Sequence, residues 1–512
     1  MNQKYILGID CGTQSTKVVV FDLEGEVITS AKKAISLERA RPNWAEQKTE
    51  EWWSSLCAVL QSVTNKIDKN KILGIAIAYQ RETFVPVDLN YKPLRSAFLW
   101  MDQRATKEAE EVRSVISESK FTNITGKFLN PTPSIMKIKW IKNNEPDIWE
   151  KIDKIMTVGA YINYKLTGKV IDAAAGADTT GLFDINNGKW SDKLLTIGGL
   201  RKSQLFDVLP SGSKVGDVTK IAAERTGLSE GTPVFLAGGD GQVFAVGVGA
   251  IKESEMAISI GTSGTCDIHG SKIDLKSGSR ALTSCIEGLY VHESVLMSAA
   301  NNVTWFIRNF ESADQDRRNG SPESELDQAI GNIPPCSDGL ITIPYLRGCM
   351  MPYNDPNTRG ATLGWSDIHT KLHFYKSILE GIAFEIKLIV DNYEKNSGVN
   401  ISSITIGGGG AASSKWLQII ADIVGKKIHI SDTTENTALG AAIMAVCGLN
   451  IYENVDLAVK KMCRTRNTFI PDDDRLLLYN KFFNEVYKEV YPAIRKYLKY
   501  LGSFDIDSSG GK

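Results

Sequence analysis

Two stretches of the 512-residue chain place a glycine and a threonine between apolar, strand-like runs. The first, ILGIDCGTQSTKVVVFD, spans residues 6–22, and the second, MAISIGTSGTCDI, spans residues 256–268. Glycine lets the backbone approach a ligand closely, and consecutive backbone N–H groups in such a turn form a concave anion site. Two such turns predict that a polyphosphate is gripped from opposite sides. Asp10, at the end of the first strand, is positioned to hold Mg²⁺ and its waters.

A charged pair follows the strand expected at Ile72–Tyr79. Arg81 and Glu82 lie just beyond its carboxyl end, where α/β crevices bind ligands. The guanidinium offers a fork of donors and the carboxylate a pair of acceptors, which suits a polyol; a surface ion pair is the alternative. Trp100 either packs its ring on a carbon backbone or belongs to the core, and Gln242 is a candidate hydrogen-bond partner for a hydroxyl.

A third glycine cluster, IGGGGAASSKW at residues 406–416, lies between a strand and a helix. Bare backbone followed by serines at a helix N-terminus can pack against adenosine or approach phosphates, although flexible turns share this composition. The sequence has no Walker A motif, no GxGxxG after a strand and no HRD/DFG set, which disfavours those nucleotide enzymes. His369 and His373 have helical ligand spacing, but no third ligand is evident, and we interpret them as surface residues.

The elements that must position these residues alternate between strands and helices, which predicts α/β layering. Each half opens on a strand, a Gly-Thr turn and another strand, so we interpret the halves as a duplication. The Gly-containing stretch at Val246–Glu255 marks the boundary, giving domains 1–250 and 251–500. Long helices are expected at Leu372–Glu394 and Leu476–Leu498, and residues 501–512 are expected to form a flexible tail.

The composition of the chain limits the classes of protein to which it can belong. A hydrophobic content of 42% and a charged content of 23% are typical of a soluble globular protein. The net charge of −1 argues against a nucleic-acid or anionic-membrane partner. The longest apolar run, at residues 438–449, is too short to cross a bilayer. The eight cysteines form no CxxC pair and no signal segment is evident, so we expect a reducing cytoplasm.

Taken together, these motifs resemble the FGGY carbohydrate kinases over nearly the whole chain. The ordered matches are GIDCGTQSTK (8–17), QRET (80–83), LWMDQR (99–104), SIMKIKWIKNNEP (134–146), AGGDGQ (237–242), SIGTSG (259–264), PYNDPNTRGATLGW (352–365), GGGGAASSKWLQIIADIVG (407–425) and ENTALGAAIMA (435–445). The resemblance implies an α/β fold with two ribonuclease H-like domains of the actin/hexokinase type, flanking a central cleft. It also implies that ATP and Mg²⁺ are the cofactors. A homodimer is one assembly that the resemblance allows.

The resemblance implies roles for single residues. Asp240 is the implied catalytic base, because a sugar hydroxyl that attacks a phosphate needs a carboxylate to accept its proton. The implied sugar contacts are Gln80, Arg81, Glu82, Trp100, Asp240 and Gln242. The implied ATP contacts are Thr13, Gln14, Ser15, Lys17, Gly261 and Thr262 at the phosphates and Gly409, Gly410 and Ser414 at the adenosine, with Asp10 at the metal.

The motifs leave several substrates open. QRET is shared with glycerol kinases, but Thr132 stands where those enzymes carry a tyrosine, and Gly241 follows Asp240 where they carry glutamine. The segment 176–195 resembles xylulose kinases, whose usual Met-His is here Arg81-Glu82. GGDGQ is similar to kinases of a five-carbon dihydroxyketone autoinducer. We expect a linear ketose or polyol, with a pentulose such as xylulose favoured over glycerol, a tetritol or the dihydroxyketone. A non-catalytic, nucleotide-gated sugar sensor or scaffold is the alternative of another class.

Overall fold

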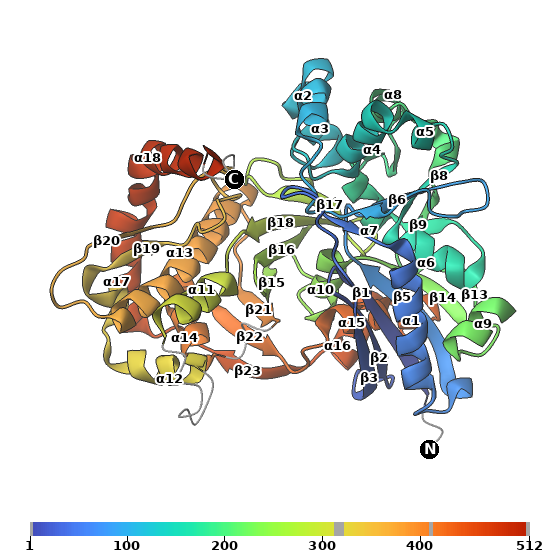
Figure 1. Cartoon of the computed structure of the whole chain (residues 1–512). Helices are drawn as coiled ribbons and strands as arrows, with labels where there is room; N and C mark the ends of the chain where they lie inside the picture. Colours follow the sequence, from blue (N-terminus) through green and yellow to red (C-terminus); the bar gives the residue numbers. More distant parts are fainter. Residues whose placement is uncertain (1–3, 312–321, 409–412, 508–512) are drawn as a thin grey trace.

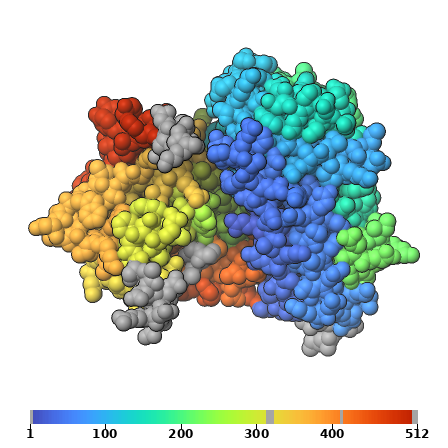
Figure 2. Space-filling model, in the orientation of Figure 1, coloured from blue at the N-terminus to red at the C-terminus, as the bar shows by residue number. Residues whose placement is uncertain are grey.

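The computed structural model describes residues 4–311, 322–408 and 413–507. Two α/β lobes lie side by side, one formed mainly by the N-terminal half of the chain and the other mainly by the C-terminal half (Figure 1). The space-filling view shows a hollow where the lobes meet (Figure 2). Among the described residues, no helix combines the length and apolar character needed to cross a membrane.

Each lobe is built on a large mixed sheet. The N-terminal sheet has the strand order β13 (Lys214–Asp217), β14 (Pro233–Gly239), β5 (Ile72–Tyr79), β1 (Tyr5–Cys11), β2 (Ser15–Phe21) and β3 (Val27–Ala34). The C-terminal sheet has the order β17 (Arg280–Thr283), β18 (Tyr290–Leu296), β16 (Gly264–Gly270), β15 (Glu255–Ile260), β21 (Ser403–Gly407), β22 (Lys427–Ser431) and β23 (Thr465–Phe469).

The two sheets repeat one pattern. In the first, β1, β2 and β3 pair antiparallel, and β5 and then β14 add parallel to β1. In the second, β15, β16 and β18 pair antiparallel, and β21 and then β22 add parallel to β15. The duplication expected from the two Gly-Thr phrases is therefore present in the fold.

Two helices are exchanged between the lobes. Helix α10 (Asp240–Gly247) follows β14 of the first sheet and contacts both sheets, β14 of the first and β15 and β16 of the second. Helix α15 (Asn436–Gly448) comes from the C-terminal half but packs on β1, β5 and β14, where Ile6, Val19 and Phe21 face it. The strands β1, β2, β5 and β14 are largely buried, which explains their mostly apolar sequences, whereas the edge strand β3 is largely exposed.

The exchanged helices cross with their backbones in contact. A Cβ atom at Gly247 would lie 1.8 Å from the Asn436 carbonyl oxygen, and one at Gly440 would lie 2.0 Å from the Val243 carbonyl oxygen. Only glycine permits this approach. The expected boundary between residues 250 and 251 divides the sequence into two halves. The packing crosses this boundary, because α15 and α16 (Val455–Met462) of the second half add to the core of the N-terminal sheet.

The remaining elements surround these sheets. The N-terminal lobe adds the four-stranded sheet β4 (Glu46–Gln47), β7 (Ala97–Phe98), β6 (Phe84–Val87) and β8 (Lys154–Thr157), the pairs β10 (Phe183–Asp184) with β11 (Lys189–Trp190) and β9 (Ile171–Ala173) with β12 (Asp207–Leu209), and the helices α1 (Thr49–Thr64), α2 (Thr106–Val115), α3 (Glu118–Thr125), α4 (Ser134–Asn144), α5 (Pro146–Trp149), α6 (Val158–Thr167), α7 (Ala174–Ala177), α8 (Asp192–Gly198) and α9 (Lys220–Thr226). The C-terminal lobe adds the pair β19 (Ile341–Ile343) with β20 (Ala361–Leu363) and the helices α11 (Ala300–Phe310), α12 (Pro322–Ala329), α13 (Lys371–Ser397), α14 (Ser414–Val424), α17 (Asp473–Phe482) and α18 (Lys488–Asp507).

The C-terminal helical region differs from expectation. The single helix expected at Leu476–Leu498 is α17, a π-helical turn at Phe483–Tyr487 and then α18. Residues 501–507, expected in a flexible tail, belong to α18; residues 508–512 lie outside the described residues. Gly502 explains the longer helix, because its backbone packs so closely on the Asn357 carbonyl oxygen that a Cβ would lie only 1.9 Å away.

Candidate active site

The two Gly-Thr turns have similar local geometry. The Gly12 N–H donates to the Ser15 carbonyl at 3.1 Å, and the Gly261 N–H donates to the Ser263 carbonyl at 2.9 Å. Gln14 and Thr262 are exposed, and Thr13 and Gly261 are partly exposed. Each turn therefore presents accessible backbone where an anion can approach.

Trp100 links the first turn to the sugar-side residues. Its indole N–H donates to Thr13 Oγ1 at 3.0 Å, and its backbone N–H donates to Thr83 Oγ1 at 3.1 Å. The residue is 38% exposed, so the alternative of a core tryptophan is wrong. An exposed ring beside the phosphate turn is available to pack against a ligand.

Asp10 and Asp240 bring two carboxylates together from different elements. Asp10 lies at the end of β1, opposite Lys17 on β2, and Asp240 is the first residue of α10. Burial, together with the charge of Asp240, raises the pKa of Asp10 to about 7. Lys17 lowers this pKa, although its Nζ pairs with Glu435 at 2.7 Å.

This environment fits a bound cation. A buried carboxylate beside another carboxylate gains stability when a positive ion is near. No group of three or more histidine, cysteine, aspartate or glutamate ligands occurs among the described residues. Mg²⁺ commonly retains waters and uses one or two carboxylates together with substrate phosphates, so Asp10 suits that mode of binding.

Asp240 has one oxygen engaged. Its Oδ1 accepts from Arg81 Nε at 3.1 Å and from the Gly241 N–H at 2.9 Å. Within the part of the chain that the structure describes, Oδ2 accepts no hydrogen bond, and the side chain is 38% exposed. Desolvation by the surrounding protein raises its pKa, and Arg81 opposes this shift. The free oxygen is available to accept a proton.

A chain of alternating charges continues from Asp240 into both lobes. Arg81 NH1 lies 2.7 Å from Glu293 Oε2, Glu293 Oε1 accepts from Arg280 Nε at 2.6 Å, and Arg280 NH1 donates to Glu82 Oε1 at 2.7 Å. Arg81 and Glu82 belong to the N-terminal lobe, whereas Arg280 and Glu293 lie on β17 and β18. Arg81 and Glu82, which are predicted to contact the sugar, are therefore paired with residues of the other sheet.

Two predicted sugar contacts lie behind this surface. Gln80 is buried, donates to Gln47 Oε1 at 3.0 Å and accepts from Thr83 Oγ1 at 3.1 Å. Gln242 is also buried, donates to the Ala175 carbonyl at 2.9 Å and accepts from Arg81 NH1 at 3.4 Å. Their amides are hydrogen-bonded inside the protein, to Gln47 and Arg81 among other groups. Their role as sugar contacts stays a prediction.

Sequence reasoning missed Arg280, Glu293 and Asp267. Glu293 pairs across the strands with both of the others, in β17 and β16. Burial raises the pKa of Asp267 well above its usual value, and the neighbouring charge of Glu293 raises it further. The sequence did contain a signal for two of them. Asp267 and Glu293 are carboxylates within otherwise apolar, buried strands, and a buried carboxylate needs a charged partner or has a function.

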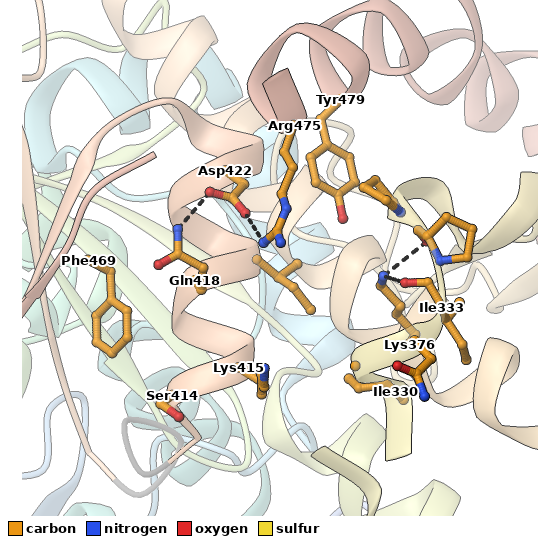
Figure 3. Close-up of a pocket in the computed structure, with 15 residues that line it drawn as sticks. Ile330, Ile333, Lys376, Ser414, Lys415, Gln418, Asp422, Phe469, Arg475 and Tyr479 are labelled. Carbon is orange, nitrogen blue, oxygen red and sulfur yellow. Dashed lines mark hydrogen bonds and ion pairs between the residues drawn. The ribbon is translucent and has the colours of Figure 1, made fainter. Parts of the chain in front are cut away.

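One of the predicted adenosine residues, Ser414, lies at a separate pocket. Gly409 and Gly410 lie outside the described residues. Ser414, the first residue of α14, is exposed and lines a pocket of about 460 Å³ with Lys415, Gln418 and Asp422 of the same helix (Figure 3). The lining from other elements includes Ile333, Lys376, Phe469, Arg475 and Tyr479.

Comparison with known proteins covers both halves. The family model for the N-terminal domain of the FGGY family of carbohydrate kinases matches residues 5–247, and the C-terminal domain model matches residues 256–449. The chain belongs to the FGGY carbohydrate kinases. It is therefore an enzyme of the phosphotransferase class with an alcohol group as acceptor.

Individual relatives agree with the family. The xylulose kinase of Lactococcus lactis subsp. lactis is 29% identical over 95% of this chain and 96% of its own. The ligand-bound xylulose kinase of Lactobacillus acidophilus superposes with a TM-score of 0.90 at 24% identity, covering 97% of this chain and 100% of that one. Plasmodium falciparum glycerol kinase with ADP gives a TM-score of 0.85 at 26% identity, covering 94% and 97%. The predicted two-domain α/β fold is confirmed.

Proposed function

We propose that this FGGY kinase transfers the γ-phosphoryl group of ATP to a hydroxyl of a small, uncharged linear sugar or polyol, with a pentulose such as xylulose as the best candidate. The observation that best supports this function is the position of Asp240. Its free Oδ2 lies on a carboxylate held by Arg81, next to Glu82 on the sugar side and to Asp10 on the phosphate side.

ATP is proposed to lie across the two Gly-Thr turns. Its phosphates would meet Thr13, Gln14, Ser15 and Lys17 on one side and Gly261 and Thr262 on the other, with the adenosine towards Gly409, Gly410 and Ser414. Because Lys17 pairs with Glu435, it must exchange that partner to reach a phosphate. The Gly12 and Gly261 N–H groups are also engaged, each with a carbonyl of its own turn. The proposal therefore assigns the phosphates to the other groups of the two turns, which form a concave anion site.

The reaction assigns each residue one task. Arg81 and Glu82 hold the sugar, and Trp100 covers it beside the phosphate turn. Asp240 Oδ2 accepts the proton of the attacking hydroxyl as the sugar oxygen bonds to the γ-phosphorus and the bond to the ADP oxygen breaks. Approach of the lobes excludes water, which would otherwise compete as acceptor. Mg²⁺, held through Asp10 and waters, would offset negative charge on the phosphates.

The substrate rests on the relatives and the Arg81–Glu82 pair together. The name of the Lactococcus relative favours xylulose, whereas that of the Plasmodium structure favours glycerol. A tetritol or a five-carbon dihydroxyketone satisfies the same pair of groups. A homodimer stays a prediction.

A coupled assay of ADP release tests the function. The purified chain is mixed with ATP, Mg²⁺ and, separately, xylulose, ribulose, erythritol, glycerol or a dihydroxyketone, and the phosphorylated product is identified by mass spectrometry. We expect sugar-dependent release that is highest with a pentulose. Slow hydrolysis that no sugar accelerates would instead favour the non-catalytic sensor or scaffold.

A further inference from the structure

Arg280 connects the C-terminal sheet to the sugar-side turn of the N-terminal lobe. It lies on β17, beside α7 at the junction of the lobes (Figure 1). Its NH1 donates to Glu82 Oε1 at 2.7 Å, and its Nε donates to Glu293 Oε1 at 2.6 Å. The Arg280 side chain is 13% exposed and that of Glu82 is 5% exposed, so water screens this contact weakly.

Glu82 has a constrained backbone. Its φ of 55° lies in the left-handed region, which costs energy for any residue with a side chain. The Glu82 N–H donates to Thr179 Oγ1 at 3.2 Å, and the Glu82 carbonyl accepts from Ser134 Oγ at 3.0 Å. These bonds fix the main chain, and Arg280 alone fixes the carboxylate among the described residues. The direction of that carboxylate therefore depends on the other lobe.

The pairing leaves a specific set of groups for a ligand. Glu82 Oε1 is occupied, whereas Oε2 has no hydrogen bond to any residue that the structure describes. The unpaired Glu82 oxygen is a hydrogen-bond acceptor. A sugar hydroxyl can donate to it, whereas an ionised sugar carboxylate has no proton to donate.

We propose that Arg280 is a positioning residue that sets sugar specificity through Glu82, presenting Glu82 Oε2 to a hydroxyl of an uncharged sugar and disfavouring sugar acids. This inference rests on the proposed function, because it requires Glu82 to face the sugar. It places part of the specificity on the C-terminal sheet and makes sugar binding sensitive to how the two lobes meet.

Kinetics of Arg280→Met and Arg280→Lys test the proposal, with the sugar that the wild type uses best. Arg280→Met keeps the apolar stem but loses the charge. We expect the KM for the sugar to rise about tenfold or more, since a hydrogen bond to a charged group is lost, while the KM for ATP changes less than about twofold. Arg280→Lys should recover part of the loss.

A double-mutant cycle separates positioning from bulk stability. Because Arg280 acts through Glu82, adding Arg280→Met to Glu82→Gln should raise the sugar KM little beyond Glu82→Gln alone. Arg95→Met is the matched control, since Arg95 is also buried between two carboxylates, Glu46 and Glu145, outside this chain of charges. Thermal unfolding of each variant reports its folding.

Three results overturn the proposal while the kinase function stands. They are an unchanged sugar KM in both Arg280 variants, equal rises in the sugar and ATP KM values that Arg95→Met reproduces, and a wild type that prefers gluconate to every uncharged sugar. If the wild type releases ADP with no sugar at all, the proposed function itself fails, and this inference fails with it.

Discussion

Arg81 Nε donates to Asp240 Oδ1 at 3.1 Å, which joins the proposed base to the sugar-side turn. The two residues are 159 positions apart, and they meet because β5 and β14 are adjacent parallel strands that end at the same edge of the sheet. Arg81 also reaches Glu293 of the other sheet. The proposed base, the proposed sugar contact and the junction of the lobes are therefore joined by direct side-chain contacts.

This contact predicts a pH effect. The Arg81 charge lowers the pKa of Asp240 against the raising effect of burial. Replacing Arg81 with methionine should raise that pKa further, so the ionised base is lost at a higher pH. The acidic limb of the kcat profile should therefore move to higher pH. A profile that keeps its wild-type position would contradict the role given to Arg81.

The buried Glu385 predicts how stability depends on pH. Both of its oxygens accept from tyrosine hydroxyls, those of Tyr345 and Tyr487, each at 2.8 Å. Burial raises the pKa of Glu385 to about 7, so the folded protein binds this proton more tightly than the unfolded chain does. Its favourable contribution is complete below the unfolded pKa and is lost as the pH rises through 7.

Glu385→Gln should remove that dependence. Relative to wild type, the variant should gain stability between pH 5 and pH 8, by up to about 3 kcal/mol. Thermal unfolding at several pH values measures this difference in stability. Gln418→Glu is not a suitable control variant, because it would add a negative charge beside Asp422. A Tm difference between variant and wild type that stays constant with pH would show that Glu385 does not titrate in this range.

The helix crossing predicts a large effect from one methyl group. Gly247→Ala would place a Cβ 1.8 Å from the Asn436 carbonyl oxygen, so α10 and α15 must move apart. We expect a loss of stability of about 1–3 kcal/mol, as for other overpacked sites, and a lower kcat because the lobes meet along these helices. Gly331→Ala is the control, because its Cβ would meet no atom within 4 Å. Equal Tm values for the two variants would contradict the crossing.

The sequence predicted the parts of this account that are local. Gly-Thr turns, a charged pair beyond a strand and an aspartate after two glycines are read within a few residues, and their placement at strand ends follows from α/β geometry. Arg280 was missed because its contact with Glu82 spans 198 positions and depends on how two sheets meet. The exchange of α10 and α15 was missed for the same reason.

Burial and internal contacts are also outside the reach of a sequence motif. Gln80 and Gln242 stay predicted sugar contacts, and only the structure shows that their amides are hydrogen-bonded inside the protein. The expected tail was wrong at residues 501–507 because a glycine, which weakens an isolated helix, here allows close packing against Asn357.

Replacement of Asp240 by asparagine tests the central claim most directly. Asparagine keeps the shape and can still accept from Arg81, but it cannot take a proton from a hydroxyl. The matched control is Asp192→Asn, since Asp192 is likewise the first residue of a helix but is exposed on α8. Both kcat and the sugar dissociation constant are measured for each variant.

If Asp240 is the base, Asp240→Asn lowers kcat by about 10²–10⁴-fold and leaves the sugar dissociation constant within about threefold of wild type. Asp192→Asn should match wild type in both quantities. A kcat for Asp240→Asn within a few-fold of the wild-type value would contradict the account, because the proton of the attacking hydroxyl would then have another acceptor.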